Sequence, residues 1–157
     1  GCGSDFFSIP TDEFRRAPGS MPAMPKHQLF VNLSVRDLDA SKAFFHKLGF
    51  EFNPQFTDAN AACMLIGEDA FAMLLVEPFF RGFTKLGICD TGTHTEMLLA
   101  LMCETRAEVD ELVHEAIAAG GRHAMDPQDH GFMYGWSFYD LDGHHWEVGW
   151  MDPAHVQ

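Results

Sequence analysis

The chain has 157 residues, of which 46% are hydrophobic and 21% charged, so it can bury a core and does not have the composition of a disordered chain. Its 23 acidic and 10 basic residues give a formal net charge of −13, which disfavours nucleic acid as a partner and tolerates neutral or cationic small molecules. The four cysteines form no Cys-x-x-Cys pair, and no apolar run reaches the roughly 20 residues of a membrane helix, so we expect a cytoplasmic protein.

The first part of the chain predicts a tail followed by a small α+β module. Residues 1–26 lack a signal-peptide pattern and are expected to form a loosely packed N-terminal tail. In QLFVNLSV, which starts at Gln28, four aliphatic residues alternate with Gln28, Phe30, Asn32 and Ser34, as in a strand with two different faces. Asp37 can cap a helix that runs through Leu48. Three shorter strands are predicted at 50–53, 61–66 and 71–76, which completes a module over 27–76.

Residues 77–95 interrupt this pattern. The segment EPFFRGFTKLGICDTGTHT contains a proline, three glycines and three phenylalanines, which is typical of a linker with one short helical turn.

The same order of elements returns in residues 96–152. A strand over 96–103 precedes Thr105-Arg-Ala-Glu108, a capping box in which each side chain satisfies a backbone donor of the other residue. An apolar stripe then predicts an amphipathic helix that ends at Gly120-Gly121. A short strand near 122–125 and long strands at 132–139 and 144–151 follow, with Asp142-Gly143 as the hairpin turn.

This repeat predicts the architecture. Val35 closes the first strand of one half and Cys103 that of the other, 68 residues later. Each half has one helix, which covers only one face of its sheet. We therefore expect an α+β fold of two βαβββ modules whose uncovered faces form a shared concave cavity.

Two segments resemble the vicinal-oxygen-chelate superfamily, which includes glyoxalase I, bleomycin-resistance proteins, fosfomycin-resistance enzymes and extradiol dioxygenases. SFYDLDGHHWEV is similar to its closing hairpin, F-x-D-P-D-G-x-x-x-E, with Asp140, Asp142, Gly143 and Glu147 in place and Leu141 where proline is usual. FVNLSVRDLDASKAFFHKLGF resembles its first strand and helix. The resemblance covers about 28–151 and implies a homodimer that takes a small-molecule ligand.

The resemblance also implies positions for a divalent metal ion, one in the first and fourth strand of each half. These positions hold Phe30, Met73 or a neighbour, Leu98 and Glu147. Only Glu147 offers a donor atom, whereas a divalent ion needs three or more. We therefore expect no cofactor, with a divalent metal at Glu147 as the less favoured alternative.

A shifted cluster is the other way to build a metal site. Stepping two residues along a strand keeps the same face, so Glu96, His145 and Glu147 could converge. The alternative, which we prefer, has Glu96 in water at the cavity mouth and His145 bonded to a neighbour.

Glu147 is the predicted central group. It alternates with Trp146, Val148 and Trp150, which should face the helix, so its carboxylate should point into the cavity and be poorly solvated. That setting suits a general base or a hydrogen-bond anchor. A relic carboxylate bonded to Asn32 or to water is an equal alternative.

The remaining candidates surround Glu147. Ser137 should line the cavity, while His130 and Tyr134 form either a proton-transfer pair at its mouth or, as we favour, a loop residue and a core tyrosine. His94, His144 and His155 are expected in water. The predicted ligand-binding residues are Phe30, Asn32, Met73, Glu96, Leu98, His130, Tyr134, Ser137 and His145.

Two functions of different class are compatible with these residues. One is a glyoxalase-like lyase or dioxygenase-like enzyme with Glu147 as its acid–base group or remaining metal ligand. The other is a metal-free binding protein that sequesters a drug or other small molecule, as bleomycin-resistance proteins do.

Overall fold

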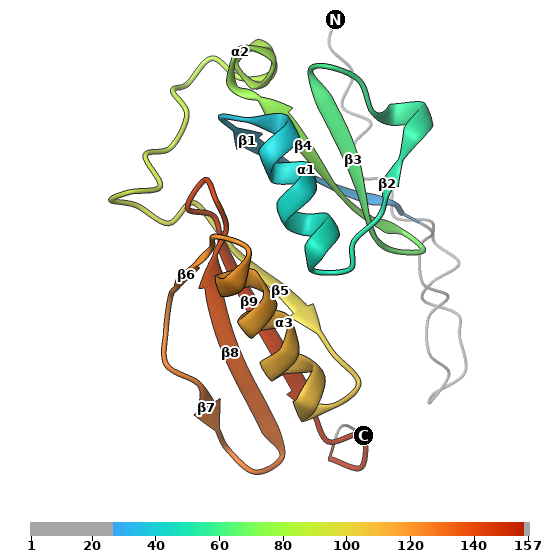
Figure 1. Cartoon of the computed structure of the whole chain (residues 1–157), viewed down its shortest axis with the longest axis vertical. Coiled ribbons are helices and arrows are strands. Elements are labelled where there is room, and N and C mark those ends of the chain that lie inside the picture. Colours follow the sequence, from blue (N-terminus) through green and yellow to red (C-terminus); the bar gives the residue numbers. More distant parts are fainter. Residues whose placement is uncertain (1–26, 156–157) are drawn as a thin grey trace, which may run out of the picture.

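The computed structural model describes residues 27–155, which form two βαβββ modules joined by a connecting segment (Figure 1). The first module contains β1 (Leu29–Val35), α1 (Leu38–Lys47), β2 (Phe52–Asn53), the 3-10 turn η2 (Pro54–Phe56), β3 (Ala61–Gly67) and β4 (Ala70–Val76). The connecting segment contains α2 (Glu77–Phe80) and the 3-10 turn η3 (Arg81–Phe83). The second module contains β5 (Leu98–Met102), α3 (Arg106–Ala118), β6 (Arg122–His123), β7 (Gln128–Asp129), β8 (Met133–Tyr139) and β9 (His145–Met151). The predicted tail over 1–26 lies outside the described residues.

Both sheets have the same topology, which confirms the predicted duplication. The strand orders are β1-β4-β3-β2 and β5-β9-β8-β6, with the first and last long strands of each module paired in parallel. The strand expected over 122–125 spans only Arg122–His123, and the short β7 was not predicted. No helix in the described part of the chain combines the length and apolar character that crossing a membrane requires.

The helix starts follow the capping residues. The Asp37 carboxylate accepts a hydrogen bond from the Ala40 N–H, and the Thr105 hydroxyl accepts one from the Glu108 N–H. The predicted capping box is only half right. The Glu108 carboxylate accepts from the N–H of Glu104, one residue before the cap, so it satisfies a different donor.

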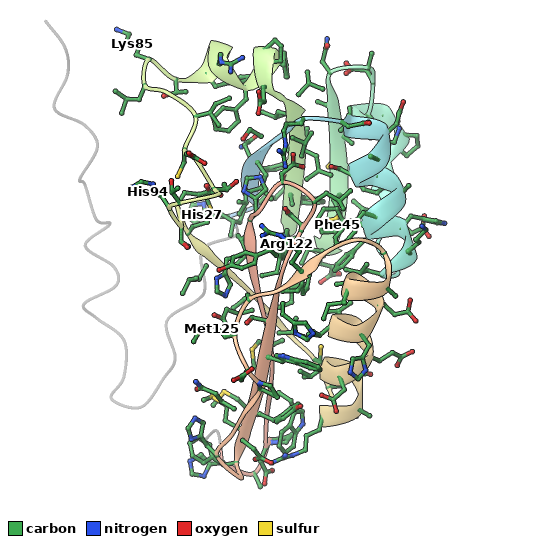
Figure 2. The ribbon with its side chains drawn as sticks, turned by 60° about the vertical axis from the view of Figure 1, so that its left-hand side comes forward. His27, Phe45, Lys85, His94, Arg122 and Met125 are labelled. Carbon is green, nitrogen blue, oxygen red and sulfur yellow. The ribbon has the colours of Figure 1, made fainter. Side chains whose placement is uncertain are left out.

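One hydrophobic core runs through both modules. The α1 residues Phe44 and Phe45 contact the second sheet, with ring centroids 6.3 Å from Phe138 and 5.4 Å from Trp146, respectively. Phe138, Trp146 and Val148 are fully buried, as the strand alternation predicts. The modules are therefore joined end to end, with α1 and α3 on the same side of the molecule (Figures 1 and 2). We define the open face of a sheet as the face that its helix does not cover.

The turn between β8 and β9 fastens the modules together. The Asp142 carboxylate accepts hydrogen bonds from the backbone N–H and the Nε of Arg36, at 2.9 and 3.1 Å, and from the Ser41 hydroxyl. The buried Asp140 carboxylate accepts from the N–H groups of Asp142 and His144 and from the indole Nε1 of Trp146. The aspartates that carry the superfamily resemblance are thus structural groups at the module junction.

His144 belongs to the same junction, so the expectation that it lies in water is wrong. Its side chain is 3% exposed. Its Nε2 lies 2.7 Å from the carbonyl oxygen of Ser34 in β1, and its Nδ1 lies 2.5 Å from Oε1 of Glu96, just before β5. The ring therefore connects the hairpin turn, the first module and the end of the connecting segment.

Candidate functional site

The open face of the second sheet carries a cavity of about 290 Å³. Four methionines from four different segments surround it, and Glu147 lies on its wall, so we call it the methionine pocket. Its lining residues include Met102, Met125, Met133 and Met151, together with Ala100, Asp126, Gln128, His130, Gly135, Ser137, Glu147 and Gly149. Figure 2 shows Met125 on the side of the second module away from α3.

Two glycines keep the floor of the methionine pocket free of side chains. Gly135 in β8 and Gly149 in β9 are directly paired across the strands. A Cβ atom on Gly149 would lie only 3.2 Å from the sulfur of Met102, so even an alanine there would push against the pocket wall. The hollow exists because two adjacent strands both lack a side chain at the same level.

Glu147 lies beside this floor, in register with Ser137 on one side and Ala100 on the other. Its side chain is 39% exposed, so the expectation of a poorly solvated carboxylate is wrong. Asn32, which was predicted to bond to the Glu147 carboxylate, directs its amide at the carbonyl oxygen of Phe30 instead. Ser137 accepts a hydrogen bond from the N–H of Met125, which ties the loop before β7 to the pocket.

The neighbour of Glu147 is His145. Its Nε2 lies 3.0 Å from Oε1 of Glu147, within ion-pair distance, while its side chain is 9% exposed. The direction of approach does not suit a hydrogen bond, so Nε2 has no hydrogen-bond partner among residues 27–155. A buried imidazole nitrogen beside a solvated carboxylate is a polar pair that could exchange a proton with a molecule bound on this face.

The residues at the superfamily metal positions do not fit a divalent ion. Phe30 stacks on Phe71 with ring centroids 4.7 Å apart, Met73 pairs with Asn32, and Leu98 is an exposed apolar side chain. The alternative cluster does not form, because Glu96 pairs with His144 rather than with His145. Within 27–155, no group of three His, Cys, Asp or Glu side chains could hold a metal ion.

The methionine pocket is built by the second module alone, so it is not the predicted cavity shared by the two modules. None of the first-module candidates Phe30, Asn32 and Met73 lines the methionine pocket, and neither does Leu98. The end-to-end junction explains this result, because it sets the two sheets in line and leaves their open faces side by side rather than opposed.

Of the other candidates, His130 and Tyr134 both line the methionine pocket, but the Tyr134 hydroxyl is directed at α3. The Tyr134 hydroxyl donates to the carboxylate of Asp110 in α3, and this hydrogen bond, together with burial, raises the pKa of Tyr134 to about 12. The two side chains are therefore not a proton-transfer pair, and the alternative of a loop histidine and a packed tyrosine describes them better.

Arg106 supports the methionine pocket, and it was not among the residues predicted from the sequence. Its guanidinium binds both carboxylate oxygens of Asp129, at 2.7 and 2.9 Å, donates to the carbonyl oxygen of Gly131, and stacks over Tyr134 and Trp150. These contacts fix the loop that carries His130 onto the pocket rim. The methionines could have been found from sequence, since strand alternation puts Met133 and Met151 on the same face as Glu147.

Comparisons with known proteins agree with this fold. Residues 28–67 match the family model "bleomycin resistance protein-like N-terminal". The hypothetical protein SA1046 from S. aureus is 32% identical, with a TM-score of 0.67 over 80% of this chain and 93% of that one. A glyoxalase-related enzyme from Fulvimarina pelagi is 20% identical, with a TM-score of 0.67 over 80% and 88% of the two chains.

A fosfomycin resistance protein, FosX from Listeria monocytogenes, is less similar in structure. It is 21% identical, with a TM-score of 0.57 over 80% of this chain and 91% of that one. No curated protein matches the sequence.

Proposed function

The chain belongs to the vicinal-oxygen-chelate superfamily of glyoxalases, bleomycin-resistance proteins and dioxygenases, and on this premise we propose that it binds a small molecule in the methionine pocket without a metal ion. The observation that carries this proposal is the lining of the pocket. Thioether and glycine surfaces surround two carboxylates, Glu147 and Asp126, and no lysine or arginine of the described residues lines the cavity.

This lining selects the chemistry of the ligand. Methionine side chains are flexible and polarisable, so they adapt to ligands of different shape and contact aromatic rings favourably. The two carboxylates favour a neutral or cationic molecule over an anion. The pocket therefore suits an apolar molecule with an amine or other hydrogen-bond donor, held by Glu147.

Catalysis is the second candidate function, and the contact between His145 and Glu147 supports it. A carboxylate 3.0 Å from an imidazole nitrogen can act as a general base on an acidic C–H or O–H of the ligand. No step of this kind requires the metal that the lining residues do not fit.

We also propose that a homodimer completes the site. Large apolar side chains stand exposed on the open faces, among them Phe30, Leu65, Leu98 and Met102. A second copy laid across these faces would cover them and supply the opposing wall that one chain lacks. The free thiols of Cys63, Cys89 and Cys103 fit a reducing compartment such as the cytoplasm.

A thermal-shift screen tests the binding function. Purified protein is screened against hydrophobic amines, neutral aromatic compounds and carboxylic acids, with Glu147→Gln beside the wild type and Glu68→Gln, an exposed turn residue, as the matched control. Amines should stabilise the wild type and the control and should stabilise Glu147→Gln less. Equal stabilisation of all three proteins would place binding elsewhere.

Metal analysis of the same preparations separates the two functions from metal-dependent chemistry. We expect no stoichiometric divalent metal after dialysis. Zinc, nickel, iron or manganese retained near one per chain and lost in Glu147→Gln would contradict the metal-free proposal.

A further inference from the structure

A second cavity, of about 280 Å³, lies under the connecting segment and shares no lining residue with the methionine pocket. Its walls come from β1, from the segment after η3, and from the residues that lead into β5. We call it the junction pocket. It is lined by Asn32, Leu33, Ser34, Phe80, Thr84, Leu86, Gly87, Ile88, Cys89, Glu96, Met97 and His144.

Most of the junction pocket is apolar. Leu33 forms part of the buried core, and Phe80, Ile88 and Met97 extend this surface toward the solvent. Leu86 is 81% exposed, so a large apolar side chain stands in water next to the cavity. An apolar molecule in the pocket would remove this surface from water, which favours binding.

The polar end of the pocket is the pair formed by the buried His144 and the partly exposed Glu96. The imidazole is held from both sides, by the Ser34 carbonyl and by the Glu96 carboxylate, so its position is fixed by the fold. The Glu96 side chain is 21% exposed, which leaves part of the carboxylate accessible from the cavity. Because the imidazolium compensates its charge, this carboxylate can accept a hydrogen bond from a neutral donor without requiring a cation.

The neighbouring groups support the same chemistry. Burial, and then the nearby Glu96 carboxylate, raise the pKa of the Cys89 thiol, so it stays protonated at neutral pH and is a poor nucleophile. The amide of Asn32 makes only a 3.4 Å contact to the carbonyl oxygen of Phe30 and can turn toward a ligand. The pocket thus offers acceptors and weak polar contacts at one end and apolar surface elsewhere.

We propose that the junction pocket is a second small-molecule site, which binds an apolar ring system carrying a single hydroxyl or amine that donates to Glu96. The occupant would contact β1, the connecting segment and the start of β5 at once. Binding would therefore stabilise the junction between the modules. This site is independent of the methionine pocket and of its ligand.

The test uses 2-naphthol, which has one ring system and one hydroxyl, and 2-methoxynaphthalene, which has the same rings without the donor. Titration of methyl-labelled wild-type protein with 2-naphthol should shift the signals of Ile88 and Met97 in a saturable way. The methoxy compound should bind roughly tenfold more weakly, because it cannot donate to the carboxylate. Equal affinity of the two compounds would overturn the role of Glu96.

Two tryptophan variants locate the site. Ile88→Trp fills the junction pocket and Met125→Trp fills the methionine pocket, and both positions are partly exposed and therefore tolerate a larger side chain. Binding of 2-naphthol should be lost in the first and kept in the second. Binding that is kept in Ile88→Trp and lost in Met125→Trp would refute the proposal. Shifts confined to Met102 and Met125 in the wild type, or the absence of any saturable shift, would also refute it.

Discussion

The turn of the β8–β9 hairpin and its second strand differ in what their carboxylates bind. In the turn, Asp140 and Asp142 are buried, and each accepts three hydrogen bonds from defined donors. Three residues into β9, Glu147 is 39% exposed and has one close polar neighbour among the described residues, His145. Both groups of residues belong to the same superfamily motif, yet only Glu147 has capacity left for a ligand.

This difference explains why the motif predicts the fold better than the chemistry. A carboxylate whose acceptor sites are filled by the protein holds the chain in place. A carboxylate that faces a cavity with few partners can bind something else. The motif combines both kinds, so its presence identifies the hairpin and the junction, whereas the ligand depends on residues around Glu147 that the motif does not include.

The largest expected effect comes from Asp140→Asn. The substitution keeps the shape but removes the charge and turns one acceptor into a donor facing the N–H groups of Asp142 and His144 or the Trp146 indole. We expect the free energy of unfolding to fall by about 2–3 kcal/mol, because a buried N–H group that loses its acceptor keeps the cost of its removal from water. Urea denaturation measures this, with Glu68→Gln as the control. A loss below about 1 kcal/mol would remove the distinction between the turn and the strand.

The second prediction concerns pH. Burial alone would lower the pKa of His144, but Asp140, the Ser34 carbonyl and Glu96 outweigh it and raise the pKa above the ordinary value of 6.5. The folded protein therefore favours the imidazolium more than the unfolded chain does. This stabilisation is fully present below pH 6.5 and is lost as the pH rises through the higher folded pKa.

The measurement is the unfolding free energy of the wild type and of His144→Gln between pH 5.5 and about pH 9, a span that covers the usual range of histidine pKa values. The wild type should lose stability toward the alkaline end, and the variant should be less stable at acid pH with a flatter profile. Parallel curves would show that His144 does not carry the pH dependence.

The sequence was sufficient for features that depend on local periodicity. Alternation in β9 correctly put Trp146 and Val148 in the core and Glu147 on the open face. The Asp37 cap likewise depends on a residue three positions away. The environment of His144 could not be predicted in this way, because its partners Ser34 and Glu96 are 110 and 48 residues distant.

The composition of the methionine pocket, to which the first module contributes no residue, could not be predicted for a related reason. Each sheet was correctly predicted to have an open face, but nothing local says how two sheets are oriented relative to each other. That orientation depends on contacts between distant segments, such as Arg36 with Asp142 and Phe45 with Trp146. The missed β7 is a two-residue strand, too short for any periodicity to appear.

A smaller effect is expected for Arg106→Gln. Hydrogen bonding to Arg106, supported by the Gly131 N–H, lowers the pKa of Asp129 to about 2, so the pair stays intact throughout the neutral and mildly acidic range. Losing the guanidinium should release the loop without unfolding the module. Hydrogen exchange of the His130 amide, which donates to the Met133 carbonyl, should accelerate while the melting temperature stays nearly constant. Unchanged exchange would mean that the short β7 pairing alone holds the loop.

Glu147→Gln should have the smallest effect on stability and the clearest effect on binding. The carboxylate is half-solvated, and its polar neighbour, His145 Nε2, makes no well-directed hydrogen bond to it, so little folding energy depends on the charge. We expect the unfolding free energy to change by less than about 0.5 kcal/mol in either direction, as for most surface substitutions.

The same variant should bind a hydrophobic amine about ten- to a hundredfold more weakly, because a hydrogen bond to a charged group is worth about 1.5–3 kcal/mol. Urea denaturation and calorimetric titration on one preparation give both values. A stability loss as large as that of Asp140→Asn, with binding unchanged, would make Glu147 a structural residue like the aspartates of the turn.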